Sequence, residues 1–173
     1  MAAPAPFRVN QVSGAIVSSA MRVHSLLGPG LLESAYQACL AHELRKRGLI
    51  VASQVGLPVV YDDERIELGY RIDLVVETLV IVEVKCVEAI HPVHQAQLLS
   101  YMRLSGIGVG LLINFHVAQL GTESNAWWTA KTGKNNQPTL CFPKPCGKGL
   151  EGPGETEPFF VDATSSYSDH PPD

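Results

Sequence analysis

A chain of 173 residues is long enough to bury a hydrophobic core without disulfides or a structural metal, and it suits one domain. Its 46% hydrophobic and 17% charged residues exclude the compositions of disordered and fibrous proteins. The formal net charge of -4 argues against a surface that coats nucleic acid non-specifically, because such affinity comes from Lys and Arg meeting phosphates.

The sequence carries no sign of a membrane or secretory route. No apolar run approaches the roughly 20 residues that a membrane-spanning helix needs, and the N-terminus lacks the pattern of a secretory signal. We therefore expect no membrane partner and a cytoplasmic location. The four cysteines are too few and too scattered for a disulfide framework, so we expect reduced thiols. The pattern indicates no oligomeric state and leaves a homodimer open.

Two helices are predicted at the start of the chain. Apolar residues recur at helical spacing from about residue 10 to 27, and Gly28-Pro29-Gly30 then ends the pattern. A second helical stretch runs from Leu31 to Arg47 and closes at Gly48.

Strands dominate the next part of the sequence. Runs rich in Val and Ile predict an antiparallel meander at residues 54–61, 65–76 and 79–86. A helix is expected from Pro92 to about Leu104, followed by a buried strand at residues 106–114. The order helix, helix, three strands, helix, strand predicts an α/β domain over residues 1–120.

Residues 121–173 differ in character from the rest. Gly, Pro, Asn and Ser interrupt them every few residues, which predicts an irregular, loosely ordered C-terminal tail. The dipeptide Trp127-Trp128 leaves open a third role, that of an interaction protein whose tail joins a partner or a second copy.

The strongest chemical signal lies in the last two strands of the predicted meander. Side chains alternate along a strand, so Glu83 and Lys85 share one face, and Asp73 lies on the neighbouring strand within reach of Glu83. Two adjacent carboxylates repel each other unless a cation lies between them. The alternative is a Glu83–Lys85 salt bridge on a solvent-facing strand, but the flanking Val and Ile favour a central strand.

This constellation suits phosphodiester hydrolysis. The reaction needs a hard metal such as Mg²⁺ or Mn²⁺, carboxylate oxygens to hold it and a group to position water. Asp73 and Glu83 are candidate metal ligands, and Lys85 is a candidate for orienting the water and stabilising charge.

Two helices can add residues to the same site. His94, Gln97 and Tyr101 share a helix face and are candidates for binding a phosphate backbone, with a half-buried helix edge as the alternative. Glu33 lies at the N-terminal end of the inward-facing stripe of residues on the second predicted helix, and it is a candidate metal ligand. If Gly30 is the N-cap, however, Glu33 occupies the third helical position and caps backbone amides instead.

A family resemblance follows from these motifs. Gly30-Leu31-Leu32-Glu33-Ser34-Ala35-Tyr36 is a Gly-x-x-Glu-x-x-Tyr string, and the chain resembles the GxxExxY protein family, which is similar to the PD-(D/E)XK nuclease superfamily. The likeness runs from about Asn10 to Phe115 and includes Asp73, Glu83-Val84-Lys85 and the Gln-x-x-x-Tyr element at Gln97 and Tyr101.

The resemblance implies a restriction-endonuclease-like core, a central mixed sheet flanked by helices. It also implies a Mg²⁺- or Mn²⁺-dependent nuclease acting on DNA, or on RNA, with exonuclease-like chemistry in repair or recombination. Glu33, Gln97 and Tyr101 become expected catalytic residues beside Asp73, Glu83 and Lys85. Because nuclease folds also host inactive relatives, a non-catalytic module that binds nucleic acid or protein is the alternative.

Overall fold

The computed structural model describes the backbone of residues 6–120, 127–132 and 138–141. Its elements, in chain order, are α1 (Pro6–Leu27), α2 (Glu33–Lys46), β1 (Val51–Tyr61), β2 (Glu64–Val76), β3 (Val80–Lys85), α3 (Pro92–Ser105), β4 (Val109–Asn114), β5 (Trp127–Thr132) and β6 (Pro138–Cys141). The predicted order of helices and strands up to β4 is therefore confirmed.

One six-stranded sheet organises the molecule, with its strands in chain order from β1 to β6. All neighbours are antiparallel except β3 and β4, which run parallel. A parallel pair needs a crossover connection, and α3 supplies it. The sheet is thus mixed, as predicted.

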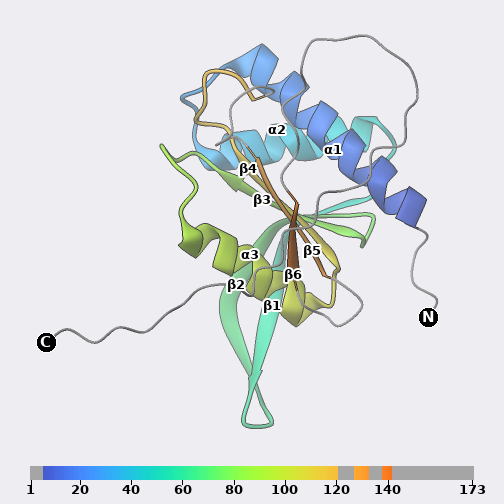
Figure 1. Cartoon of the computed structure of the whole chain (residues 1–173), viewed down its shortest axis with the longest axis vertical. Coiled ribbons are helices and arrows are strands. Elements are labelled where there is room, and N and C mark those ends of the chain that lie inside the picture. Colours follow the sequence, from blue (N-terminus) through green and yellow to red (C-terminus); the bar gives the residue numbers. More distant parts are fainter. Residues whose placement is uncertain (1–5, 121–126, 133–137, 142–173) are drawn as a thin grey trace, which may run out of the picture.

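The helices cover the two faces of this sheet. Figure 1 shows α1 and α2 on one side and α3 on the other. Beneath α1 and α2, the core includes Ile16, Tyr36, Leu40, Val82 and Phe115. Beneath α3, a second cluster includes Ile72, Ile81, Leu98, Met102 and Leu112. Each face of β3 is therefore buried, which explains why four of its six residues are Val or Ile.

Gly110 allows α3 to approach β4 closely. A Cβ atom at this position would lie 2.8 Å from both Leu98 Cδ1 and Met102 Sδ of α3. Close packing here holds α3, and with it Tyr101, against the sheet beside β3.

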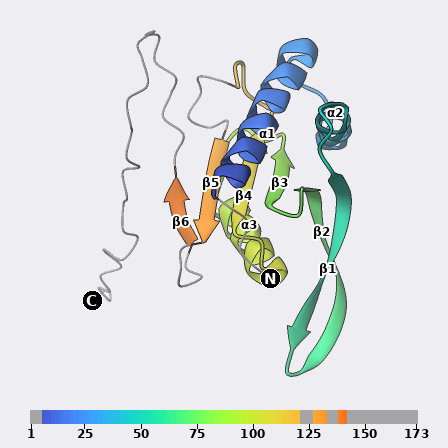
Figure 2. The same cartoon turned by 90° about the vertical axis from the view of Figure 1, so that its right-hand side faces the viewer.

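The β1–β2 hairpin extends beyond the body of the sheet, as Figure 2 shows. Its turn residues Asp62 and Asp63 have φ values of 51° and 60°, the left-handed conformation that two-residue hairpin turns require. The register of the two strands shifts between Leu57 and Val59, at Pro58, which has no amide hydrogen to donate.

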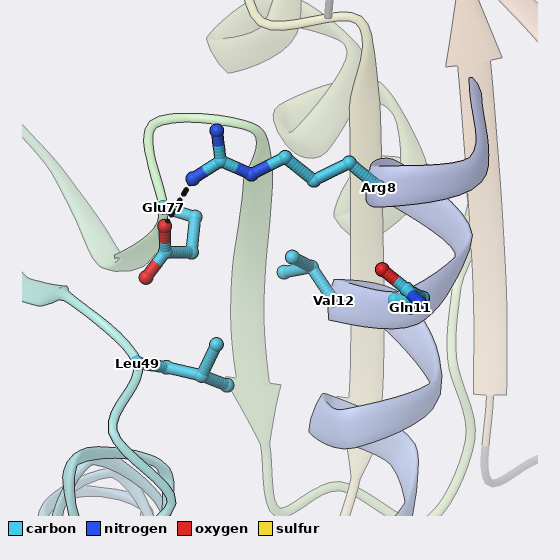
Figure 3. Close-up of a pocket in the computed structure, with 5 residues that line it drawn as sticks. All are labelled: Arg8, Gln11, Val12, Leu49 and Glu77. Carbon is cyan, nitrogen blue, oxygen red and sulfur yellow. Dashed lines mark hydrogen bonds and ion pairs between the residues drawn. The ribbon is translucent and has the colours of Figure 1, made fainter. Parts of the chain in front are cut away.

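The β2–β3 turn is fastened to the start of β1 and to α1. Glu77 Oε1 accepts a hydrogen bond from Ile50 N at 2.7 Å, and its Oε2 forms an ion pair with Arg8 Nη2 at 2.8 Å. Figure 3 shows this pair at the edge of a pocket of about 280 Å³, into which Val12 and Leu49 also point. These two contacts fix the β2–β3 turn, which lies at the opposite end of the β2–β3 ladder from Asp73.

Strands β5 and β6 lie within the segment 121–173, for which the sequence predicts an irregular tail. β5, which contains Trp127 and Trp128, pairs with β4, and β6 pairs with β5. These ten residues are therefore regular, contrary to that expectation. The rest of the segment lies outside the described residues, so the boundary at residue 120 stays a prediction.

Two expectations concern the whole described chain. None of the helices in the described ranges is long and apolar enough to cross a membrane. Cys39 and Cys86, the cysteines whose side chains the structure describes, are free thiols, as predicted.

Candidate active site

Asp73 and Glu83 meet where β2 and β3 stop pairing. The ladder between these strands ends at Leu74 and Val82, so Asp73 and Glu83 are the next residues on each side. Beyond the end of the ladder, the two carboxylates accept hydrogen bonds from backbone amides. Val84 N donates to Asp73 Oδ2 at 3.0 Å, and Asp73 N donates to Glu83 Oε1 at 3.4 Å. The predicted convergence of the two acids is what the structure shows.

Lys85 completes the group on β3. Its Nζ lies 3.4 Å from Glu83 Oε2, and the two side chains are only 13% and 2% exposed. The salt bridge that the sequence left open is present, but on a strand buried on both faces and not on a solvent-facing one. Burying two charges is costly, which favours a functional reason for keeping them there.

The environment of Glu83 disfavours its charged form. Burial is the main cause, the nearby charge of Asp73 adds to it and Lys85 opposes it, and together they raise the pKa of Glu83 to about 7. A cation between the two carboxylates would lower that pKa and offset the cost of burying both charges.

Tyr36 fixes the position at which α2 begins. Its hydroxyl donates to Gly28 O at 2.5 Å and accepts a hydrogen bond from Leu31 N at 3.2 Å. Its ring stacks on Phe115 with 4.4 Å between centroids. Gly30 has a φ of 104°, a conformation that favours glycine. In the Gly-x-x-Glu-x-x-Tyr string, the glycine and the tyrosine therefore shape the loop that presents Glu33.

Glu33 faces the same cluster from the first residue of α2. The N-cap is Leu32, so the alternative in which Glu33 occupies the third helical position is wrong. Its carboxylate accepts a hydrogen bond from the Cys86 backbone. Burial raises the pKa of Glu33, Lys85 lowers it and Asp73 raises it, so the three charges lie within electrostatic range.

Gln97 and Tyr101 lie on α3, where Gln97 Nε2 donates to the Tyr101 hydroxyl at 2.7 Å. Tyr101 is 3% exposed and belongs to the core beneath α3. The pKa of Tyr101 is raised, first by burial and also by the nearby charges of Glu83 and Asp73. This tyrosine therefore joins the core to the acidic cluster.

His94 has a structural task at the start of α3. Its Nδ1 accepts a hydrogen bond from His91 N at 3.2 Å, as part of a capping box. Burial is the first cause that lowers the pKa of His94, and the charge of Lys85 is the second, which places it near the cluster. Its predicted contact with substrate stays a prediction.

The donor set can be compared with the needs of a divalent metal. Among the residues whose side chains are described, no three His, Cys, Asp or Glu side chains lie close enough to hold one ion. The structure therefore pairs Asp73 with Glu83 but does not add Glu33 at binding distance. Mg²⁺ keeps several waters and needs only one or two carboxylates, so the pair still fits such an ion.

Three polar residues near the site were not predicted from the sequence. Gln37 and Gln54 contact Asp73, at its carbonyl and its carboxylate respectively. Asn114 is fully buried and exchanges two hydrogen bonds with the Val87 backbone, which orients the chain leaving β3 just after Lys85. Their roles depend on contacts between elements far apart in sequence.

Comparisons with known proteins agree with this geometry. A family model described as the PD-(D/E)XK nuclease superfamily matches residues 10–125, which is more than half of the chain. No curated protein and no solved structure matches. The mixed sheet with flanking helices is the restriction-endonuclease-like architecture expected of this superfamily. Its members are generally nucleases and typically use divalent metals. The chain therefore belongs to the PD-(D/E)XK nuclease superfamily.

Proposed function

We propose that the protein is a divalent-metal-dependent nuclease that hydrolyses phosphodiester bonds in DNA. The observation that carries the proposal is the group formed by the buried Glu83 and the half-buried Asp73 and Lys85, at the point where β2 and β3 stop pairing. Glu83 is 2% exposed yet lies beside a second carboxylate, an arrangement that a bound cation would stabilise.

Each side chain has a task in this reaction. Asp73 and Glu83 would hold Mg²⁺ or Mn²⁺, which when bound neutralises phosphate charge and activates water. The Lys85 ammonium, held by Glu83, is placed to orient the attacking water and to stabilise the negative charge that develops on the phosphate oxygens. Glu33 lies within electrostatic range of Lys85 and Asp73, and we propose that it contacts the ion through water.

Gln97 and Tyr101 support a DNA substrate. Their hydrogen-bonded side chains adjoin the cluster from α3, where amide and hydroxyl groups can contact phosphate oxygens. The Gln-x-x-x-Tyr spacing resembles the exonuclease-like branch that acts in repair and recombination, so we propose exonuclease-like cleavage. We also place the chain with the GxxExxY proteins, on Gly30, Glu33 and Tyr36.

Digestion of linear, circular and single-stranded DNA, with Mg²⁺ or Mn²⁺ titrated from zero, tests the proposal. We expect metal-dependent cleavage of the linear substrates and protection of the closed circle. RNA of the same sequence distinguishes the two nucleic acids. Cleavage that persists in Asp73→Ala or Lys85→Ala would rule out this site as its source.

A non-catalytic binding module is the second candidate. It is favoured by the net charge of -4 and by the lack of a three-ligand metal group among the described side chains. It predicts that the protein binds DNA or a protein partner without turnover, and that binding survives Asp73→Ala. Gel-shift and digestion assays on the same preparation separate the two candidates.

A further inference from the structure

Asp73 is held by two glutamines that come from elements distant in sequence. Gln37 lies on α2, one helical turn after Glu33, so both side chains project from the same face of that helix. Its Nε2 donates to the backbone carbonyl of Asp73 at 2.8 Å. The helix thus reaches the acidic cluster with two residues, an acid and an amide.

Gln54 contacts the same aspartate from β1. Its Nε2 donates to Asp73 Oδ1 at 3.3 Å and to Gln37 Oε1 at 3.0 Å. Since Val84 N donates to Asp73 Oδ2, each carboxylate oxygen has its own fixed donor. The two glutamines and the Val84 amide together restrict the rotation of the Asp73 side chain.

The backbone of Gln54 supports a functional reason for this arrangement. Gln54 has a φ of 53°, a conformation that residues with side chains rarely adopt inside a strand. The β1–β2 ladder pairs Ser53 with Leu74 and Val55 with Ile72 but skips Gln54 and Asp73. The Gln37 amide bonds the Asp73 carbonyl at this skipped pair. Strain of this kind persists where the surrounding structure requires it, often at functional sites.

We propose that Gln37 and Gln54 are positioning residues that hold the Asp73 carboxylate in the orientation that binds a divalent cation. The inference rests on the proposed metal-dependent function. Hydrogen bonds that orient metal-binding carboxylates commonly change metal affinity by about 10-fold to 100-fold when they are removed.

The test uses Gln37→Met and Gln54→Gly in the full chain. Methionine keeps the length of the Gln37 side chain without its donors, and glycine accepts the positive φ of Gln54 without strain. Mn²⁺ affinity is measured by electron paramagnetic resonance of the free ion, without DNA. The thermal midpoint is measured on each metal-free protein.

We expect each variant to bind Mn²⁺ about tenfold more weakly than the wild type. The metal-free midpoint of Gln54→Gly should equal or exceed that of the wild type, because strain is relieved. The double variant should lose little beyond either single variant, since the two glutamines are hydrogen-bonded to each other and act on one aspartate. The matched controls are Gln11→Met, on the exposed face of α1, and Ala52→Gly, an exposed residue of β1, and both should bind Mn²⁺ normally.

Three outcomes overturn the inference. Unchanged Mn²⁺ affinity in both variants removes the positioning role while leaving the proposed nuclease function intact. The glutamines act on folding alone if the controls lose as much Mn²⁺ affinity as the variants do. The same conclusion follows if affinity falls only in variants whose metal-free thermal midpoint also drops. A wild-type protein that binds no Mn²⁺ and cleaves no DNA removes both proposals.

Discussion

Neighbouring strands of this sheet carry two ion pairs with the same spacing and opposite surroundings. On β2, Arg65 Nε lies 2.6 Å from Glu67 Oε1, and the two side chains are 67% and 70% exposed. On β3, Lys85 Nζ lies 3.4 Å from Glu83 Oε2, and the side chains are 13% and 2% exposed. The β1–β2 hairpin extends beyond the helices, whereas β3 lies between α1 and α2 on one side and α3 on the other (Figure 1).

Burial, and not spacing, distinguishes the pair that we propose to be functional from the exposed pair. An exposed pair gains little because water screens it and its side chains lose freedom. A buried pair costs free energy unless other groups compensate. At β3 the nearby carboxylate of Asp73 makes this cost larger, and a bound cation would compensate for it. The comparison can therefore be tested by changing one pair at a time.

The largest expected difference is in DNA cleavage. Lys85→Ala should lower the cleavage rate by roughly 100-fold to 10,000-fold, because it removes the group that orients water and stabilises charge. Arg65→Ala, the matched change on β2, should leave the rate within about twofold, since the ion pair between Arg65 and Glu67 is exposed on the hairpin. Single-turnover digestion of one linear duplex measures both. Equal rates for the two variants would contradict the account.

The next effect is on the pH dependence of stability without metal. Folding raises the pKa of Glu83 from 4.5 to about 7, so the folded state binds the proton more tightly than the unfolded state. Stability is then greatest below the unfolded value and falls as the pH rises through about 7. The shift corresponds to about 3 kcal/mol.

Glu83→Gln should remove most of that fall, whereas Glu67→Gln should keep it. Urea unfolding in EDTA at several pH values between 4 and 8 gives the free energy of unfolding for each protein. Parallel curves for the wild type and Glu83→Gln would show that Glu83 titrates normally in the folded protein.

Divalent metal should stabilise the wild type by a smaller amount. Binding to the folded state alone adds about 2.7 kcal/mol when the free metal is at 100 times its dissociation constant. Thermal unfolding with and without Mg²⁺ should show this gain in the wild type and in Glu67→Gln. Glu83→Gln should show little of it, and a full gain in that variant would place the metal elsewhere.

The smallest effect is expected from the hairpin pair itself. Glu67→Gln should change the free energy of unfolding by less than about 1 kcal/mol at neutral pH, as is usual for exposed ion pairs. Chemical denaturation at low and high salt checks it. A larger loss would mean that exposure alone does not separate the two pairs.

Much of the β3 site follows from the sequence because it depends on local rules. Alternation along a strand puts Glu83 and Lys85 on one face, and the short turn before β3 brings Asp73 opposite them. The Val and Ile residues on both sides of Glu83 correctly indicated a strand buried on both faces. The order of helices and strands up to β4 came from equally local periodicity.

The remaining contacts depend on long-range packing. Gln54 has a left-handed backbone that its residue type does not predict, so its link to Asp73 was missed. The start of α2 depends on the stacking of Tyr36 against Phe115, which are 79 residues apart in the printed sequence. β5 depends on pairing with β4, a tertiary effect that the strand preference of Trp and Thr in so short a segment does not establish by itself.

The central claim is that Asp73 and Glu83 hold one divalent cation. A crystal of the protein soaked in Mn²⁺ tests it directly, through the anomalous scattering of that metal. We predict a peak between the carboxylates of Asp73 and Glu83. A map with no peak there, or with its only peak at the β1–β2 hairpin, would contradict the account.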